Sequence, residues 1–108
     1  MRNRAEARAV WHYRLRGYRI LGTNVWAAGN EIDVIARRGS RLVFCAVKSK
    51  GGAELGDPAE MVGPEKRRRL RRAAEAWLAR RPELCGLQAS FEIVAVSSGR
   101  LRRIREAF

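Results

Sequence analysis

Two short apolar runs, residues 32–36 and 42–47, are separated by the polar stretch Arg-Arg-Gly-Ser-Arg, which carries Gly39. Runs of this length, rich in β-branched residues and joined by a glycine-containing polar turn, are typical of a β-hairpin. Longer segments with helical spacing lie on both sides of this pair along the chain. We therefore expect the rest of the chain to fold around this hairpin.

The predicted hairpin carries charged side chains at positions that strand alternation places inside the fold. Successive side chains of a strand point to opposite faces. Glu31 and Asp33 therefore share one face of the first strand, and Ala46 and Lys48 share one face of the second. An acid and a lysine in buried β-structure are costly unless they pair or bind something. This cost makes Asp33 and Lys48 candidate functional residues.

The other elements follow from periodicity, glycines and prolines. Apolar residues with helical spacing predict two helices, one closed by Gly17 and one opened by Pro64. Trp26 falls in an expected turn, where we expect it to cover an edge of the core rather than to stack on an unpaired base. The predicted order is a helix over 3–16, a strand over 18–24, a turn over 25–30, the hairpin, a glycine-rich connection over 49–57, a helix over 64–80, and strands over 91–96 and 100–105.

Two charged residues lie on the apolar stripes of these helices. Glu6 precedes Ala9 and Val10 by three and four residues, and Lys66 precedes Leu70 by four. Residues at these spacings share one face of a helix. We therefore add Glu6 and Lys66 to the candidates. A purely structural role for Glu6, at the favourable end of the helix dipole, is the alternative.

Composition and length narrow the class of protein. The 108 residues are 46% hydrophobic, which suits one globular domain over 1–108. The apolar runs are too short to span a bilayer, and the chain start lacks the apolar region of a signal peptide, so we expect a cytoplasmic protein without a membrane partner. Two cysteines are too few for a disulfide framework or a metal cluster.

The net charge of +12 favours polyanions, so we expect DNA or RNA as the partner. An arginine-rich genomic composition would produce a similar charge, since 20 of the 23 basic residues are arginine. The three lysines are exceptions to this arginine-rich composition, which suggests that a compact ammonium group is required at these positions. The candidate phosphate contacts are two of these lysines and the outward arginines of the second helix: Lys50, Lys66, Arg68, Arg69, Arg71 and Arg72.

Motifs occur in a fixed order along the chain: Gly-Tyr-Arg-Ile-Leu over 17–21, Asn24, Glu-Ile-Asp-Val-Ile-Ala over 31–36, Leu-Val-Phe-Cys-Ala-Val-Lys over 42–48, and a helix over 66–78. This series resembles the YraN-like family of predicted endonucleases, within the PD-(D/E)XK nuclease superfamily. It is also similar to archaeal Holliday-junction resolvases. The resemblance covers nearly the whole chain. It implies an α/β, restriction-endonuclease-like fold with an αβββαβ core, a mixed central sheet and flanking helices.

The resemblance also implies a DNA endonuclease that depends on Mg²⁺ or Mn²⁺. Asp33 would be a metal ligand, and Lys48 would orient water or stabilise developing charge. A glutamate of the first helix joins the site in similar folds, which gives Glu6 the same role here. The chain departs from the family at Ala46, where the motif carries a metal-binding glutamate.

With Ala46 in that place, the remaining metal ligands would be Asp33, the backbone carbonyl of Val47 and Glu31. Mg²⁺ prefers near-octahedral oxygen ligation, so such a site would bind it weakly or not at all, and we expect little or no nuclease activity. Three hypotheses for the function remain: a protein of nuclease lineage that has lost one metal ligand, a natural nucleic-acid-binding pseudo-nuclease, and a cationic adaptor for acidic proteins. Branched or single-stranded DNA is among the expected substrates, and a homodimer would suit a two-fold branched one.

Overall fold

The computed structural model describes residues 4–50 and 63–105, and for Lys50 the backbone only. The elements confirm the predicted order, although the expected connection over 49–57 falls mostly outside the described residues. No helix in the described ranges is long and apolar enough to cross a membrane. In chain order the elements are α1 (Arg4–Leu15), β1 (Arg19–Ala27), β2 (Asn30–Arg38), β3 (Arg41–Lys50), α2 (Pro64–Ala79), the 3₁₀ helix η2 (Pro82–Leu84), β4 (Gln88–Ser97) and β5 (Arg100–Ile104).

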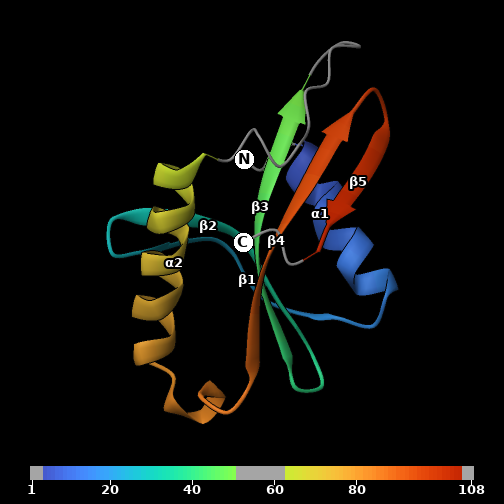
Figure 1. Ribbon diagram of the computed structural model, residues 1–108. Helices are drawn as coiled ribbons and strands as arrows, with labels where there is room; N and C mark the ends of the chain where they lie inside the picture. The colour runs from blue at the N-terminus through green and yellow to red at the C-terminus, as the bar shows by residue number, and fades with distance from the viewer. Residues whose placement is uncertain (1–3, 51–62, 106–108) are drawn as a thin grey trace.

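The five strands form one mixed sheet in the order β1-β2-β3-β4-β5. The first three form an antiparallel meander, β4 runs parallel to β3, and β5 returns antiparallel along β4. Parallel neighbours need a crossover connection, and α2 lies in that connection. α2 packs on one face of the sheet and α1 on the other (Figure 1). The predicted α/β class is confirmed, and the arrangement is compatible with a restriction-endonuclease-like core.

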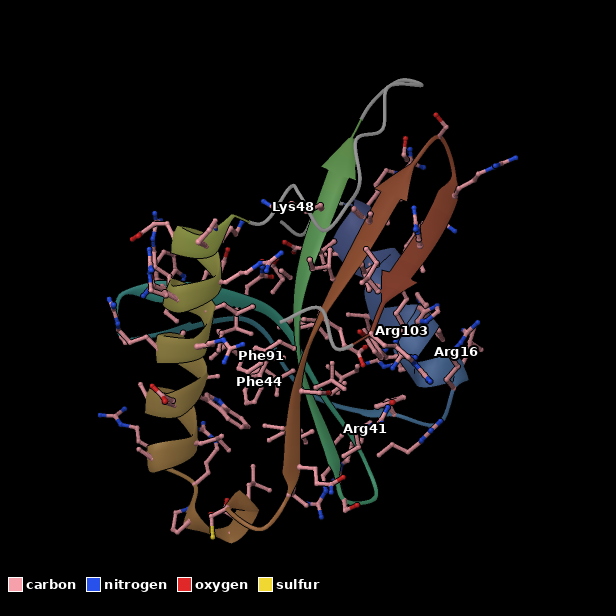
Figure 2. All side chains as sticks on the ribbon, in the orientation of Figure 1. Arg16, Arg41, Phe44, Lys48, Phe91 and Arg103 are labelled. Carbon is pink, nitrogen blue, oxygen red and sulfur yellow. The ribbon has the colours of Figure 1, made fainter. Side chains whose placement is uncertain are left out.

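The core under α2 is built on aromatic contacts. Phe44 of β3 meets Trp77 of α2 edge to face at 5.8 Å between ring centroids, and it stacks on Phe91 of β4 at 5.6 Å. Figure 2 shows both phenylalanines between the sheet and the helix. The predicted apolar stripe of α2 is buried here, through Leu70, Ala73, Ala74 and Trp77.

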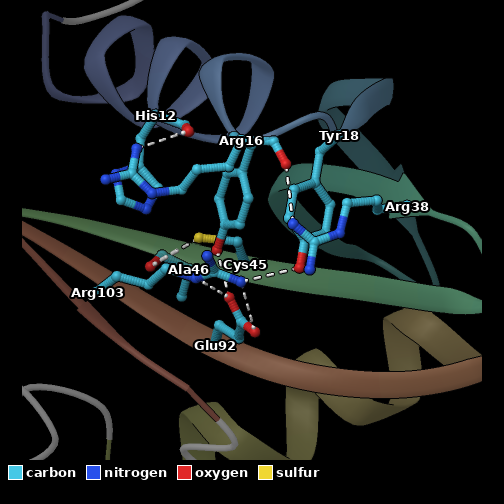
Figure 3. A network of polar contacts seen from close by, with 9 residues as sticks. His12, Arg16, Tyr18, Arg38, Cys45, Ala46, Glu92 and Arg103 are labelled. Atoms are coloured by element: carbon cyan, nitrogen blue, oxygen red, sulfur yellow. Dashed lines mark hydrogen bonds and ion pairs between the residues drawn. The ribbon is translucent and has the colours of Figure 1, made fainter.

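The core under α1 contains a buried ion pair. Glu92 of β4 is fully buried and accepts hydrogen bonds from the Tyr13 hydroxyl of α1 at 2.7 Å and from Arg103 Nε of β5 at 2.7 Å. Arg103 also donates to the Tyr18 hydroxyl at 3.1 Å (Figure 3). Buried charges are tolerated when they are paired and hydrogen-bonded. This network ties α1, β4 and β5 together.

The turn between β1 and β2 is shorter than predicted. β1 continues to Ala27, and the turn consists of Ala28 and Gly29, with φ of 51° and 74°. Two successive residues with positive φ are typical of the tight turns that match the twist of a hairpin. The expectation of a long turn over 25–30 was therefore wrong, because two left-handed residues reverse the chain.

Trp26 consequently belongs to a strand, and its side chain is 70% exposed. Its neighbours Val25 and Ala27 pack against the core under α2. Trp26 itself lines an open hollow between this end of the hairpin and the end of α2, so its side chain stays largely exposed to solvent. The expectation that Trp26 covers an edge of the core was wrong.

Candidate functional site

The candidate site lies where β2 separates from β3. The regular pairing of these strands ends at Val34 opposite Cys45, and β2 then curves away from β3 (Figure 1). One position further on, Asp33 Oδ2 accepts a hydrogen bond from the backbone N–H of Val47 at 2.7 Å. The carboxylate thus replaces the backbone acceptor that a continued ladder would have supplied.

Glu6 of α1 is linked to the same place through Asn24 of β1. Asn24 Nδ2 donates a hydrogen bond to Glu6 Oε1 at 3.0 Å. Asn24 lies opposite Asp33, between two regular cross-strand pairs, and has a φ of 49°. Asparagine tolerates this left-handed conformation better than most residues. The structure therefore brings Glu6 and Asp33 together.

The electrostatic environment makes Asp33 hard to ionise. Burial raises the pKa of this carboxyl above its ordinary value, and the hydrogen bond from the Val47 N–H opposes the rise. The charges of Glu6 and Glu31 raise the pKa further, whereas Lys66 lowers it. A carboxyl perturbed by burial and by specific charged neighbours is a candidate for function. A cation placed beside Asp33 would stabilise its ionised form.

Lys48 lies between β3 and the first turns of α2 (Figure 2), and Lys66 of α2 faces it. The contact with the Lys66 amine lowers the pKa of Lys48 to about 8, together with partial burial. The charge of Asp33 acts in the opposite direction. Two ammonium groups held together repel each other unless an anion lies beside them. This pair is therefore suited to receive an anionic group.

A hollow of about 180 Å³ lies beside these groups. Ala46 contributes a buried methyl group to its wall, at the position where the resemblance predicts a carboxylate. Because Ala46 lies on the face of β3 that packs against α2, a longer side chain there would extend into the hollow. The lining residues are Asn30, Glu31, Asp33, Ala46, Lys66, Arg69 and Leu70.

The oxygen donors do not fit a divalent metal ion in the present chain. Within the described ranges, no group of three or more His, Cys, Asp or Glu side chains is placed to hold one. Asp33 accepts from Val47, Glu6 accepts from Asn24, and Glu31 is exposed. The Val47 carbonyl lies on the same edge of β3 as its N–H, because both groups of one residue point to the same neighbouring strand. These donors are too few for octahedral Mg²⁺.

The arginines of α2 that we predicted to contact phosphate differ in their present partners. Arg68 and Arg69 form exposed ion pairs with Glu65 at 3.2 and 3.4 Å. The Arg71 guanidinium lies 5.3 Å above the ring of Phe91, and Arg72 is exposed. Exposed ion pairs are weak, so Arg68 and Arg69 remain available to a phosphate. Lys50 ends β3, and its side chain lies outside the described residues.

Sequence reasoning did not assign roles to two residues of the site. Asn24 holds Glu6, and Asn30 lines the hollow while its amide donates to the Ala28 carbonyl at 2.9 Å. Asn24 interrupts a strand with a left-handed backbone, and a local pattern of apolar residues carries no signal for that. Asparagine next to the glycine of a tight turn was the available signal for Asn30.

Fold and site together define an α/β protein with a carboxylate and two lysines at a point where two strands diverge. The chain belongs to the uncharacterised protein family UPF0102, whose model matches residues 5–96. This match confirms the resemblance to the YraN-like family.

Relatives in several bacteria agree with this assignment. The chain is 38% identical to a UPF0102 protein of Maricaulis maris, over 98% of this chain and 87% of the relative. It is 41% identical to a UPF0102 protein of Paramagnetospirillum magneticum, over 92% of this chain and 78% of the relative. A UPF0102 protein of Methylorubrum extorquens is also 41% identical, over 92% and 76% of the two chains.

Proposed function

We propose that this protein binds nucleic acid at the Asp33–Lys48 site and along the arginines of α2. Its fold would derive from metal-dependent DNA endonucleases, with cleavage weak or absent because Ala46 supplies no carboxylate. The observation that carries the proposal is the Lys48–Lys66 pair, which lies beside a hollow lined by Asp33 and Ala46.

A phosphodiester fits this pair for a simple electrostatic reason. Proximity to Lys66 favours the neutral form of Lys48, and an anionic oxygen between the two amines would reverse that preference. The net charge of +12 adds attraction for a polyanion over the whole surface. The same groups would hold a scissile phosphate in an active nuclease and a bound phosphate in an inactive relative.

The observations favour a nuclease lineage over a long-standing pseudo-nuclease. Asp33 still bridges the strand gap, and both lysines still face each other. A site without function is expected to lose more than one of its charged residues, because each of them lowers the stability of the fold and is no longer maintained by selection for activity. For the adaptor hypothesis, binding to acidic proteins, the described residues offer no comparable built site.

Electrophoretic mobility shifts across a salt series test the proposal, with single-stranded, duplex and branched DNA and with RNA of matched length. If about five phosphates are contacted, the logarithm of the affinity is expected to fall with the logarithm of the salt concentration with a slope of roughly −3.5 to −4.5. Replacing Lys48 and Lys66 together by methionine should reduce both the affinity and the slope. A flat salt dependence, or an unchanged slope in that variant, contradicts the proposal.

A further inference from the structure

Trp26 lies directly beside the candidate site, across the hairpin. In the register of β1 and β2 it is paired with Glu31, which lines the hollow together with Asp33. Directly paired residues of antiparallel strands share one face, with Cβ atoms about 5 Å apart. A largely exposed indole therefore borders the place where a phosphate would bind.

Cationic side chains flank the same hairpin on its β1 side. A second hollow, of about 580 Å³, is lined by the end of β1 and by the last turns of α2, including Trp26, Arg80 and Arg81. The Arg81 guanidinium lies 4.2 Å above the Trp77 ring and donates to the Trp77 carbonyl at 3.0 Å. Its orientation is thereby fixed before any ligand binds, while Arg80 is exposed.

We propose that Trp26 is the stacking platform for an unpaired base, so that the preferred substrate is a single-stranded or branched segment rather than continuous duplex. The inference rests on the proposed binding of nucleic acid. A strand with one phosphate at the Lys48–Lys66 pair would pass the Trp26–Glu31 face of the hairpin. Its next phosphates would meet the arginines at the end of α2.

The chemistry favours an unpaired base over other occupants. Indole offers a large flat π-face, and every nucleic-acid base can stack on it whatever its sequence. Bases inside a duplex are already stacked on their neighbours and do not present a free face. The surrounding arginines would contact the sugar–phosphate backbone of the same strand.

Substitution of Trp26 with a matched control tests this inference. Trp11 of α1 is also largely exposed, at 58%, and it lies on the opposite side of the sheet from α2. Trp26→Ala is expected to weaken single-strand binding by roughly 5- to 150-fold, the range for loss of one stacked base, and to leave binding to a capped duplex unchanged. Trp26→Phe should retain most of the single-strand affinity, and Trp11→Ala should leave both affinities unchanged.

A spectroscopic measurement separates stacking from a general loss of affinity. A Trp11→Phe background keeps Trp26 and the buried Trp77. In that background an unpaired oligothymidine should quench the fluorescence, capped duplex should not, and the quenching should be lost when Trp26 is also replaced by phenylalanine. Equal losses for Trp26→Ala on both DNA forms, or equal losses for Trp26→Ala and Trp11→Ala, would overturn the inference while nucleic-acid binding stands. If the unsubstituted protein binds neither form, the proposed function fails first, and this inference fails with it.

Discussion

The Asp33 carboxylate accepts a 2.7 Å hydrogen bond from the backbone N–H of Val47, across the point where β2 leaves β3. One side chain thereby satisfies a backbone donor and also presents a carboxylate oxygen at the gap. Accepting the Val47 hydrogen bond requires only an oxygen acceptor, whereas a functional site requires the negative charge as well. Replacing Asp33 by asparagine removes the charge and keeps the acceptor, and replacing it by alanine removes both.

Asp33→Asn is expected to stabilise the fold near neutral pH, by roughly 0.5–1 kcal/mol, the usual gain when a strained functional group is removed. The folded state raises the pKa of Asp33, so the cost of ionising it is absent below the ordinary value of 3.8 and fully present above the folded value. The stability gain should therefore grow as the pH rises above the ordinary value of 3.8 and level off once the folded carboxyl is ionised. Asp33→Ala should instead lower the unfolding free energy relative to Asp33→Asn by about 1–2 kcal/mol, because the Val47 donor loses its partner. Urea unfolding measures the unfolding free energies of both variants. A stability gain of Asp33→Asn that does not change with pH would contradict the raised pKa of Asp33.

Lys48 should titrate well below an ordinary lysine. Its amine, next to Lys66, has a pKa of about 8, and Lys66→Gln is expected to move this value upward because it removes the main cause. The lowered pKa costs stability fully below about 8, and the cost disappears above the ordinary 10.5. Carbon-13 labelling of lysine resolves the titration by NMR, since the chain has only three lysines.

Nucleic-acid affinity should fall above about pH 8 in the unsubstituted protein and less so in Lys48→Arg. An ordinary pKa for Lys48 in the free protein would show that the two amines are not in contact.

Periodicity and strand alternation were sufficient to predict the element order and to select Asp33 and Lys48 as candidate site residues, because the pattern of apolar residues along the chain sets those features locally. Three features depend on contacts between distant segments and were not predictable in that way. The Glu92–Arg103 ion pair joins two strands, and its arginine is one of many in the sequence. Trp26 was misplaced because the hairpin turn closes in two residues. Asn24 has a left-handed backbone within a strand.

The Glu92–Arg103 pair should be costly to break from one side. Arg103→Met leaves the Glu92 carboxylate buried with the Tyr13 hydroxyl as its remaining partner in this network, and losing one member of a buried pair costs about 3–5 kcal/mol. The double change Glu92→Leu with Arg103→Met should recover part of that loss, because no buried charge remains. Arg102→Met, at an exposed position on the same strand, is the control and should change little. Denaturant unfolding of the unsubstituted protein, of Glu92→Leu and Arg103→Met alone, and of the double variant forms a double-mutant cycle, and additive effects would show that the pair is not coupled.

The arginines of α2 should contribute more to nucleic-acid binding than an equal number elsewhere. Replacing Arg68, Arg69, Arg71 and Arg72 by alanine removes four charges from one helix, off its apolar stripe. The control removes four exposed arginines from α1, the turn after it and β5, at Arg14, Arg16, Arg100 and Arg102. The net charge falls equally in both variants, so general attraction changes equally. Only the α2 variant should reduce the salt slope, by about 0.9 per duplex phosphate lost. Equal effects would place the interface elsewhere.

Ala46→Glu should restore the carboxylate that the hollow lacks. The new side chain would extend into the hollow of about 180 Å³, next to Lys66 and facing Asp33. Its folding cost should be modest, because the carboxylate would meet ammonium groups rather than lie unpaired. A negative charge there should also raise the pKa of Lys48 from about 8. That shift, followed by lysine NMR, reports correct placement even without activity, and Ala46→Gln is the uncharged control.

Two carboxylates on diverging strands supply the ligand set that a divalent ion needs and that the present chain does not offer. The Ala46→Glu variant should therefore bind Mn²⁺ measurably by calorimetry and gain Mn²⁺- or Mg²⁺-dependent cleavage of DNA. A second change, Asp33→Ala or Lys48→Ala, should abolish the cleavage, the first by removing a ligand and the second by removing a stabilising charge. A variant that binds the metal and DNA but cuts no single-stranded, duplex or branched substrate would favour the pseudo-nuclease. Cleavage by the unsubstituted protein, lost on Asp33→Ala, would instead point to Glu31 as the second ligand, because it lines the same hollow.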